Sequence, residues 1–179
     1  MTWKIVSPQA GYPGITTHDT PATVEVVGST TITDVKVPLG TICDAVDETY
    51  GQGEFIRLLG VASTVVGSMV TYSATTWQTA LSPNTAGTGN TFAFAMSACV
   101  AGEHGWYQIG GLTVAKKTNV SWEPQKAVYQ SATTGRVMDT VASGKQVAGA
   151  HSANLTTTTS TTSTIVLLIN RPHNTGVII

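Results

Sequence analysis

The fold is decided by residues 51–117, which contain GQGEFIRLLGVASTVVGSMVTY at 51–72 and NTFAFAMSACVAGEHGWYQIGGLTVAKK at 90–117. In both segments, short runs rich in β-branched and aromatic residues are separated by glycine, serine and asparagine, which favour turns. The pattern predicts a succession of short strands, at 54–59, 61–72, 90–98, 105–109 and 112–115. In the third of these, Phe92, Phe94 and Met96 alternate with two alanines, so we expect large side chains on one face and small ones on the other.

The composition extends this prediction to the whole chain. Of the 179 residues, 41% are hydrophobic and only 11% are charged, and about one in six is threonine. Threonine and valine suit half-buried pleated surfaces, so we predict an all-β fold, a β-sandwich or barrel-like domain of short antiparallel strands. Few charges also give strand edges little protection against pairing with other chains. This favours a surface that faces a protein partner, although a neutral β domain would have the same composition.

The first 22 residues differ from the rest because prolines and glycines interrupt any regular element there. We predict an extended N-terminal arm at 1–22 and a single β-rich domain at 23–179. The arm carries Trp3 and Tyr12, which would be costly to leave in water, so it is expected to dock. It would lie either across a neighbouring subunit or as an ordered strand on its own domain.

Outside the central block, further strands are predicted at 22–27, 31–37, 127–130, 135–138 and 146–150, the first two forming a hairpin.

Four segments are read from their composition. The run 165–169 is apolar throughout and predicts a central strand buried on both faces. The apolar tail 177–179 is either part of the core or a contact with another chain. Residues 39–50 are the best helix candidate, with a loop or an irregular strand as the alternative. The threonine-rich stretch 156–164 predicts an exposed loop or an edge strand.

The residues that could carry chemistry do not form a recognisable site. None of the four histidines has a second histidine or a cysteine at metal-ligand spacing. The stretch GQGEF at 51–55 fails the dinucleotide-binding pattern at its third glycine. We therefore expect no enzymatic activity, no cofactor and no metal. Cys43 and Cys99 are expected to be buried thiols, with a single disulfide as the alternative.

Charge and hydropathy limit the possible partners. The net charge of −1 offers no positive field for a phosphate backbone, so nucleic acid is disfavoured. The apolar run 165–169 is far too short to span a bilayer. The N-terminus lacks the apolar core of a signal peptide, so we expect synthesis in the cytoplasm.

Several short, glycine-rich motifs follow one another along the middle of the chain. They are LGTI at 39–42, YGQGEFI at 50–56, GVA at 60–62, GSMVTY at 67–72, AGEHGWYQIGG at 101–111 and ATTGRV at 132–137. In this order they resemble the capsid decoration (cement) proteins of tailed bacteriophages, over about residues 39–150. The resemblance implies a β-rich, commonly trimeric domain without an active site, which sits on the outside of an icosahedral head and binds the major capsid protein.

The expected function is therefore that of a structural virion protein. The chain would be made in the host cytoplasm, associate as a homotrimer, bind the outer capsid surface and stabilise the head. The residues expected to make these contacts are aromatic or terminal and apolar: Trp3, Tyr12, Trp106, Tyr107 and Ile178.

Two rival functions belong to other classes. A carbohydrate- or receptor-binding β module of a phage fibre or spike would need exposed aromatic side chains, with Trp77, Trp106 and Trp122 as candidates. A small hydrolase would need a polar cleft.

Overall fold

The computed structural model describes residues 1–6, 12–20, 22–27, 30–34 and 37–175. These residues form strands and turns without a helix, which confirms the all-β prediction. The strands are β1 (Lys4–Ile5), β2 (His18–Asp19), β3 (Ala22–Val27), β4 (Thr30–Asp34), β5 (Ile42–Asp47), β6 (Gly51–Leu59), β7 (Met69–Tyr72), β8 (Thr79–Leu81), β9 (Phe92–Ala95), β10 (His104–Lys116), β11 (Ala127–Gln130), β12 (Val137–Met138), β13 (Gln146–Ser152) and β14 (Thr164–Asn174).

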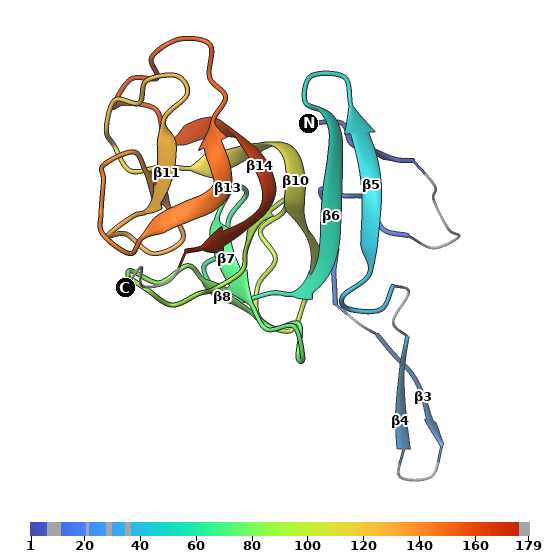
Figure 1. The fold of residues 1–179 in the computed structure, drawn as a ribbon. Coiled ribbons are helices and arrows are strands. Elements are labelled where there is room, and N and C mark those ends of the chain that lie inside the picture. The colour runs from blue at the N-terminus through green and yellow to red at the C-terminus, as the bar shows by residue number, and fades with distance from the viewer. Residues whose placement is uncertain (7–11, 21, 28–29, 35–36, 176–179) are drawn as a thin grey trace.

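Twelve of these strands form one large antiparallel sheet with sandwich-like layers, which is not closed into a barrel. The main path through this sheet is β1-β5-β6-β10-β14-β13-β11-β12, while β9, β7 and β8 continue from β10 as a branch. Figure 1 shows β5 and β6 on one side of β10, and β13 and β11 on the other. Strands β3 and β4 form a separate two-stranded sheet that projects from the body.

Strand β10 joins the two halves of the large sheet. Its first half pairs with β6 and β9, and its second half pairs with β14. The register against β6 shifts between Gln108 and Gly110, as in a β-bulge. The side-chain amide of Gln108 donates hydrogen bonds to the carbonyl oxygens of Gly110 and Leu112, both at 2.9 Å. The strands predicted at 105–109 and 112–115 are therefore one strand, because the glycines form a bulge and do not end it.

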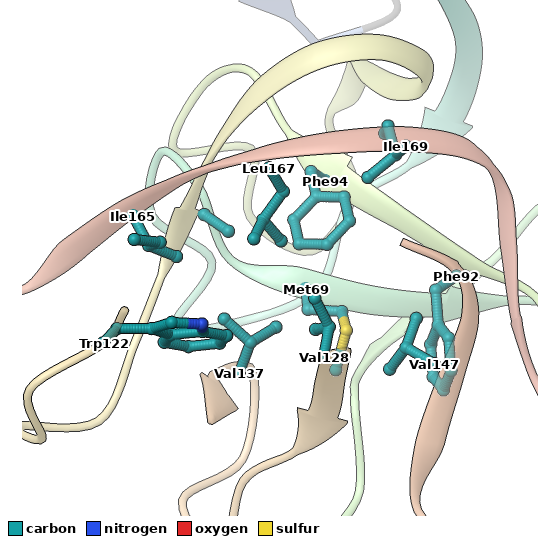
Figure 2. Packing of buried hydrophobic residues seen from close by; sticks show 11 residues of the cluster. Met69, Phe92, Phe94, Trp122, Val128, Val137, Val147, Ile165, Leu167 and Ile169 are labelled. Carbon is teal, nitrogen blue, oxygen red and sulfur yellow. The ribbon is translucent and has the colours of Figure 1, made fainter. Parts of the chain in front are cut away.

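The interior contains three clusters of buried apolar side chains. The largest, which we call the β14 cluster, lies between β14 and the strands β7, β9 and β11–β13. Figure 2 shows Ile165, Leu167 and Ile169 of β14 facing Trp122 and Val137 across this cluster. Its members are Met69, Phe92, Phe94, Ala115, Trp122, Val128, Val137, Val147, Ile165, Leu167 and Ile169.

The other two clusters cover the two faces of β6 and the first half of β10. The central cluster contains Ile56, Leu58, Val70, Ala93, Ala95, Cys99, Tyr107 and Ile109. The strap cluster, on the opposite face, contains Trp3, Ile15, Val37, Ala45, Phe55, Met96 and Trp106. Strand β6 therefore contributes alternate residues to two separate cores, Phe55 to the strap cluster and Ile56 and Leu58 to the central cluster, which explains why this part of the strand has apolar side chains on both faces.

Strand β9 confirms the predicted alternation of large and small side chains. Phe92 and Phe94 belong to the β14 cluster, whereas Ala93 and Ala95 belong to the central cluster. The small residues allow a close layer on their side, as expected. Met96 lies beyond the end of β9 and packs in the strap cluster.

The helix predicted at 39–50 is wrong, and its alternative, a strand, is correct. Strand β5 pairs with β6 along its whole length, from Ile42 opposite Ile56 to Asp47 opposite Gly51. Gly40 has a φ of 81°, a left-handed conformation that does not continue into a right-handed helix.

The strand predicted at 61–72 is also too long, since only β7 is extended. The preceding residues form turns that side-chain hydroxyls stabilise. Thr64 Oγ1 donates to Val61 O at 2.7 Å, and Ser68 Oγ accepts a hydrogen bond from Val65 N at 3.1 Å. The threonine-rich stretch 156–164 is an exposed loop up to the start of β14, the first of its two predicted alternatives.

Candidate functional site

Residues 1–6 and 12–20 form what we call the N-terminal strap. They cross one face of β5, β6 and β10 and pack on the strap cluster. Strand β1 adds to the edge of β5, and β2 adds to β10 at His104 and Gly105. The described parts of the predicted arm thus lie on their own domain, which was the second of the two alternatives.

Asp47 holds the beginning of the strap. Its carboxylate accepts hydrogen bonds from the backbone N–H groups of Thr2, of Thr49 at 2.9 Å and of Tyr50 at 3.1 Å. Burial alone would raise the pKa of Asp47, but these donors outweigh it and lower the pKa below its ordinary value of 3.8. Because the folded-state pKa is lowered, the contact stabilises the fold above about pH 4, and that contribution is lost as the pH falls further.

The two aromatic residues predicted to anchor the arm do dock, on the chain's own sheet. Trp3 is 9% exposed, and its ring lies 4.9 Å from that of Phe55 at an interplanar angle of 71°. It also stacks on Tyr50 at 6.3 Å. Tyr12 is half-buried, with its ring 6.0 Å from that of Trp106. These contacts cover the strap cluster.

Trp106 and Tyr107 are fully buried. Adjacent residues of a strand face opposite sides of the sheet, and both faces of β10 are covered here. Trp106 lies under the strap and donates a hydrogen bond from Nε1 to Pro13 O at 3.2 Å. Tyr107 lies in the central cluster, where burial raises its pKa well above 10. The structure therefore offers neither side chain to a partner at the surface. Ile178, also predicted as a contact, lies outside the described residues.

A buried charge holds the second half of the strap. Arg57 on β6 is 1% exposed and forms an ion pair with Asp19 of β2. Its guanidinium carbon also lies 5.5 Å from the ring centre of Trp106, within the range of a cation–π contact. Burial lowers the pKa of Arg57 to about 10, so the side chain is still charged at neutral pH.

The second half of β10 and the adjacent β14 present an apolar surface to solvent. In their register, Leu112 lies opposite Leu168, and Val114 lies opposite Val166. We call these four residues the outer-face patch. Leu168 is 40% exposed and the other three are half-buried. The intervening residues, such as Leu167, point into the β14 cluster.

The prediction for 165–169 is therefore half correct. As expected, β14 is a central strand, with β10 on one side and β13 on the other. It is not buried on both faces, because among the described residues only the β14 cluster covers it. Two further apolar side chains are exposed on β5, Ile42 at 46% and Val46 at 42%.

The aromatic platform that a carbohydrate-binding module would need is not exposed. Trp106 and Trp122 are fully buried. Trp77 is half-buried and packs closely over Gly40, where an added Cβ would lie 2.5 Å from its ring. Over the part of the chain that the structure describes, no two tryptophans lie side by side at the surface.

The described residues contain no group of three or more histidine, cysteine, aspartate or glutamate side chains placed to hold a metal ion. Cys43 and Cys99 are free thiols, half-buried and buried respectively. Burial raises the pKa of Cys43 to about 12 and also raises the pKa of Cys99, so both stay protonated at neutral pH. No disulfide joins them, which agrees with the first of the two predictions.

Comparison of this chain with protein-family models, curated proteins and solved structures returned no match. In the described part of the chain, no helix is long and apolar enough to cross a membrane. The resemblance to capsid decoration proteins therefore stays a prediction from sequence motifs.

Two polar residues that organise this site were missed by the sequence analysis. Asp47 was grouped with a helix, although an aspartate two residues before Thr49 and four before a glycine is a turn signal that could have been used. Arg57 had no such signal. Its partner Asp19 is remote in sequence, and only the pairing of β2 with β10 brings the two charges together.

Proposed function

We propose that this protein is a capsid decoration protein, a structural component of a tailed-phage virion. It associates with copies of itself, as a homotrimer, and binds the major capsid protein on the outer surface of the head. Its contribution is buried contact area that opposes disruption of the shell.

The outer-face patch is the observation that carries this proposal. Strand β14 has the composition of a strand buried on both faces, yet the part of the chain that the structure describes covers only one of them. The uncovered side chains, including Leu168, pair with apolar residues of β10 across the strand boundary. An apolar sheet face of this kind is stabilised when another protein surface covers it. We assign this face to the contact between copies of the chain.

The strap is not needed as a clamp in this proposal. Trp3 and Tyr12 cover the chain's own core, so the contacts with other subunits are assigned to the outer-face patch instead. Low net charge and few charged residues also favour close packing of copies, because little electrostatic repulsion opposes it.

Substitution Leu168→Lys tests the proposal. A buried lysine at the centre of an apolar contact is costly, so we expect the affinity between copies to fall by at least about tenfold, the effect of a typical interface hot spot. Light scattering after size exclusion would measure the mass of the assembly. Cosedimentation with shells of the capsid protein encoded in the same genome would measure binding to the head.

The matched control is Leu155→Lys, because Leu155 is 96% exposed in a loop outside the sheet. We expect this variant to keep the mass and the shell occupancy of the unmodified chain. Urea unfolding of both variants would exclude a folding defect as the cause. An unmodified chain that stays monomeric and leaves the shells bare would contradict the proposal.

A further inference from the structure

Beneath the second half of the strap lies a group of ionisable side chains that the proposed function does not use. Asp19 of β2 pairs with the buried Arg57, as described above. His18 Nε2 lies 3.6 Å from Glu103 Oε2, just before β10 begins. His104, the first residue of β10, is 8% exposed. Apart from Glu103, which lies in the turn before β10, these groups belong either to the strap or to the strands on which it rests.

His104 occupies the middle of this group. In the sheet register it lies between Asp19 of β2 and Leu59 of β6. Trp106, two residues further along β10, lies opposite Arg57, so His104 and Arg57 are on the same face of the sheet. The imidazole is therefore close to a permanent positive charge, in a place that the strap shields from water.

The environment of Arg57 leaves little capacity for a second positive charge. Its Nε and Nη1 atoms are buried without a hydrogen-bond partner among the described residues, so one carboxylate, from Asp19, compensates the guanidinium. Repulsion between like charges is much stronger in a shielded site than in water. A protonated His104 would compete with Arg57 for that carboxylate.

We propose that His104 makes attachment of the strap dependent on pH, and that protonation of its imidazole releases residues 12–20 from β10. This inference does not depend on the proposed function, since it concerns contacts within a single chain.

The direction of the effect follows from the two states of the imidazole. Burial, and secondarily the charge of Arg57, lower the pKa of His104 below its ordinary value of 6.5. In the released state the imidazole is in water and regains the ordinary pKa. The attached strap is therefore fully stabilised above about pH 6.5 and loses stability as the pH falls below that value.

A second histidine, His18 of the strap, belongs to the same group of side chains, with its Nε2 atom 3.6 Å from Glu103 Oε2. Removing His18 leaves His104 and Arg57 on their shared face of the sheet, so the response to pH should persist, whereas removing His104 should abolish it. These opposite expectations distinguish His104 from a general effect of acid on the strap.

Hydrogen exchange of the full chain, measured by mass spectrometry between pH 7.5 and pH 5, tests the proposal. After correction for the intrinsic exchange rate, we expect protection of residues 12–20 to fall several-fold, and by no more than about tenfold per pH unit, the limit for one proton. Protection of β14 should stay constant. Substitution His104→Gln should remove the pH dependence, and His18→Gln should retain it.

His151→Gln is the matched control, because His151 is exposed on β13, away from the strap. We expect it to leave the response unchanged. If His104→Gln fails to fold, His104→Asn and Asp19→Asn replace it. Asp19→Asn should loosen the strap at every pH while the dependence on pH remains. The proposal is overturned if protection of the strap does not change with pH, if it falls together with that of β14, or if the response persists in the His104 variant.

Discussion

At the scale of single residues, buried polar side chains determine which loops are held in place. Lys117 is fully buried, and its ammonium donates hydrogen bonds to three backbone carbonyl groups. The acceptors are Thr118 O at 3.3 Å, Val120 O at 2.7 Å and Thr159 O at 3.0 Å. The last of these lies in the threonine-rich loop, so one side chain fastens that loop to the end of β10.

Substitution Lys117→Met should destabilise the protein, because it preserves the length of the side chain but leaves these carbonyl groups without their donor. We expect the free energy of unfolding to fall by about 2–4 kcal/mol, as for a lost set of hydrogen bonds to a charged group. Urea unfolding would measure it. Lys116→Met is the control, because Lys116 is half-buried and its ammonium makes no such hydrogen bonds to the described residues. This substitution should change the free energy of unfolding by less than about 1 kcal/mol. Equal effects of the two substitutions would refute this role.

At the scale of the elements, the bulge in β10 is the feature on which the sheet depends. Gly111 has a φ of 90°, and an added Cβ would lie 2.3 Å from Gln52 O of β6. The close approach of the two strands lets β10 keep its pairing with β6 through the bulge as far as Gly111, while β14 pairs along the other edge of β10 from Gly110 onward. Glycine is required here for both its conformation and its lack of a side chain.

Substitution Gly111→Ala should therefore lower the free energy of unfolding by more than substitution of a glycine that is needed only for its left-handed conformation. Gly51 has a φ of 70° with no atom within 4 Å of an added Cβ. We expect Gly51→Ala to lower the free energy of unfolding by about 1–2 kcal/mol, the cost of a left-handed conformation. Gly111→Ala should exceed this by at least about 1 kcal/mol or prevent folding. Urea unfolding of both variants measures the difference, and similar values would argue against the close approach.

At the scale of the whole molecule, the strap completes the fold. The strap cluster joins Trp3 and Ile15 of the strap to Phe55 and Trp106 of the sheet. Without the strap, the rings of these two sheet residues and the charge of Arg57 would face water on one side. The strap is therefore part of the hydrophobic core, although it precedes the large sheet in sequence and is extended.

Deletion of residues 1–20 should lower the urea midpoint of the isolated chain and increase binding of a hydrophobic dye to the exposed cluster. The reason is the loss of a buried tryptophan, because truncating such a side chain by itself lowers the free energy of unfolding by about 3–5 kcal/mol. A clamp that acted only on neighbouring subunits would leave the stability of a monomer unchanged. Comparison at a concentration at which the full-length chain is monomeric separates the two cases.

Local pattern was enough to predict the fold class and much of the strand arrangement. The alternation at Phe92–Ala95 identified a strand with two different faces, and the apolar run at 165–169 identified a central strand. Both predictions were possible because successive side chains of a strand point to opposite faces, so the order of apolar residues indicates which faces are buried. The aromatic residues of the arm were rightly expected to dock. Local pattern misplaced 39–50 as a helix, because apolar residues in so short a segment fit either period.

The candidate site depends on contacts that no local pattern contains. Asp19 and Arg57, or Lys117 and Thr159, are far apart in sequence and meet only through the pairing of strands and the path of loops. Burial of Trp106 and exposure of Leu168 likewise depend on which sheet face the rest of the chain covers. The alternation of apolar and other residues along a strand shows which side chains share a face of the sheet. Whether that face meets the chain's own core or is left for another molecule is settled by long-range packing.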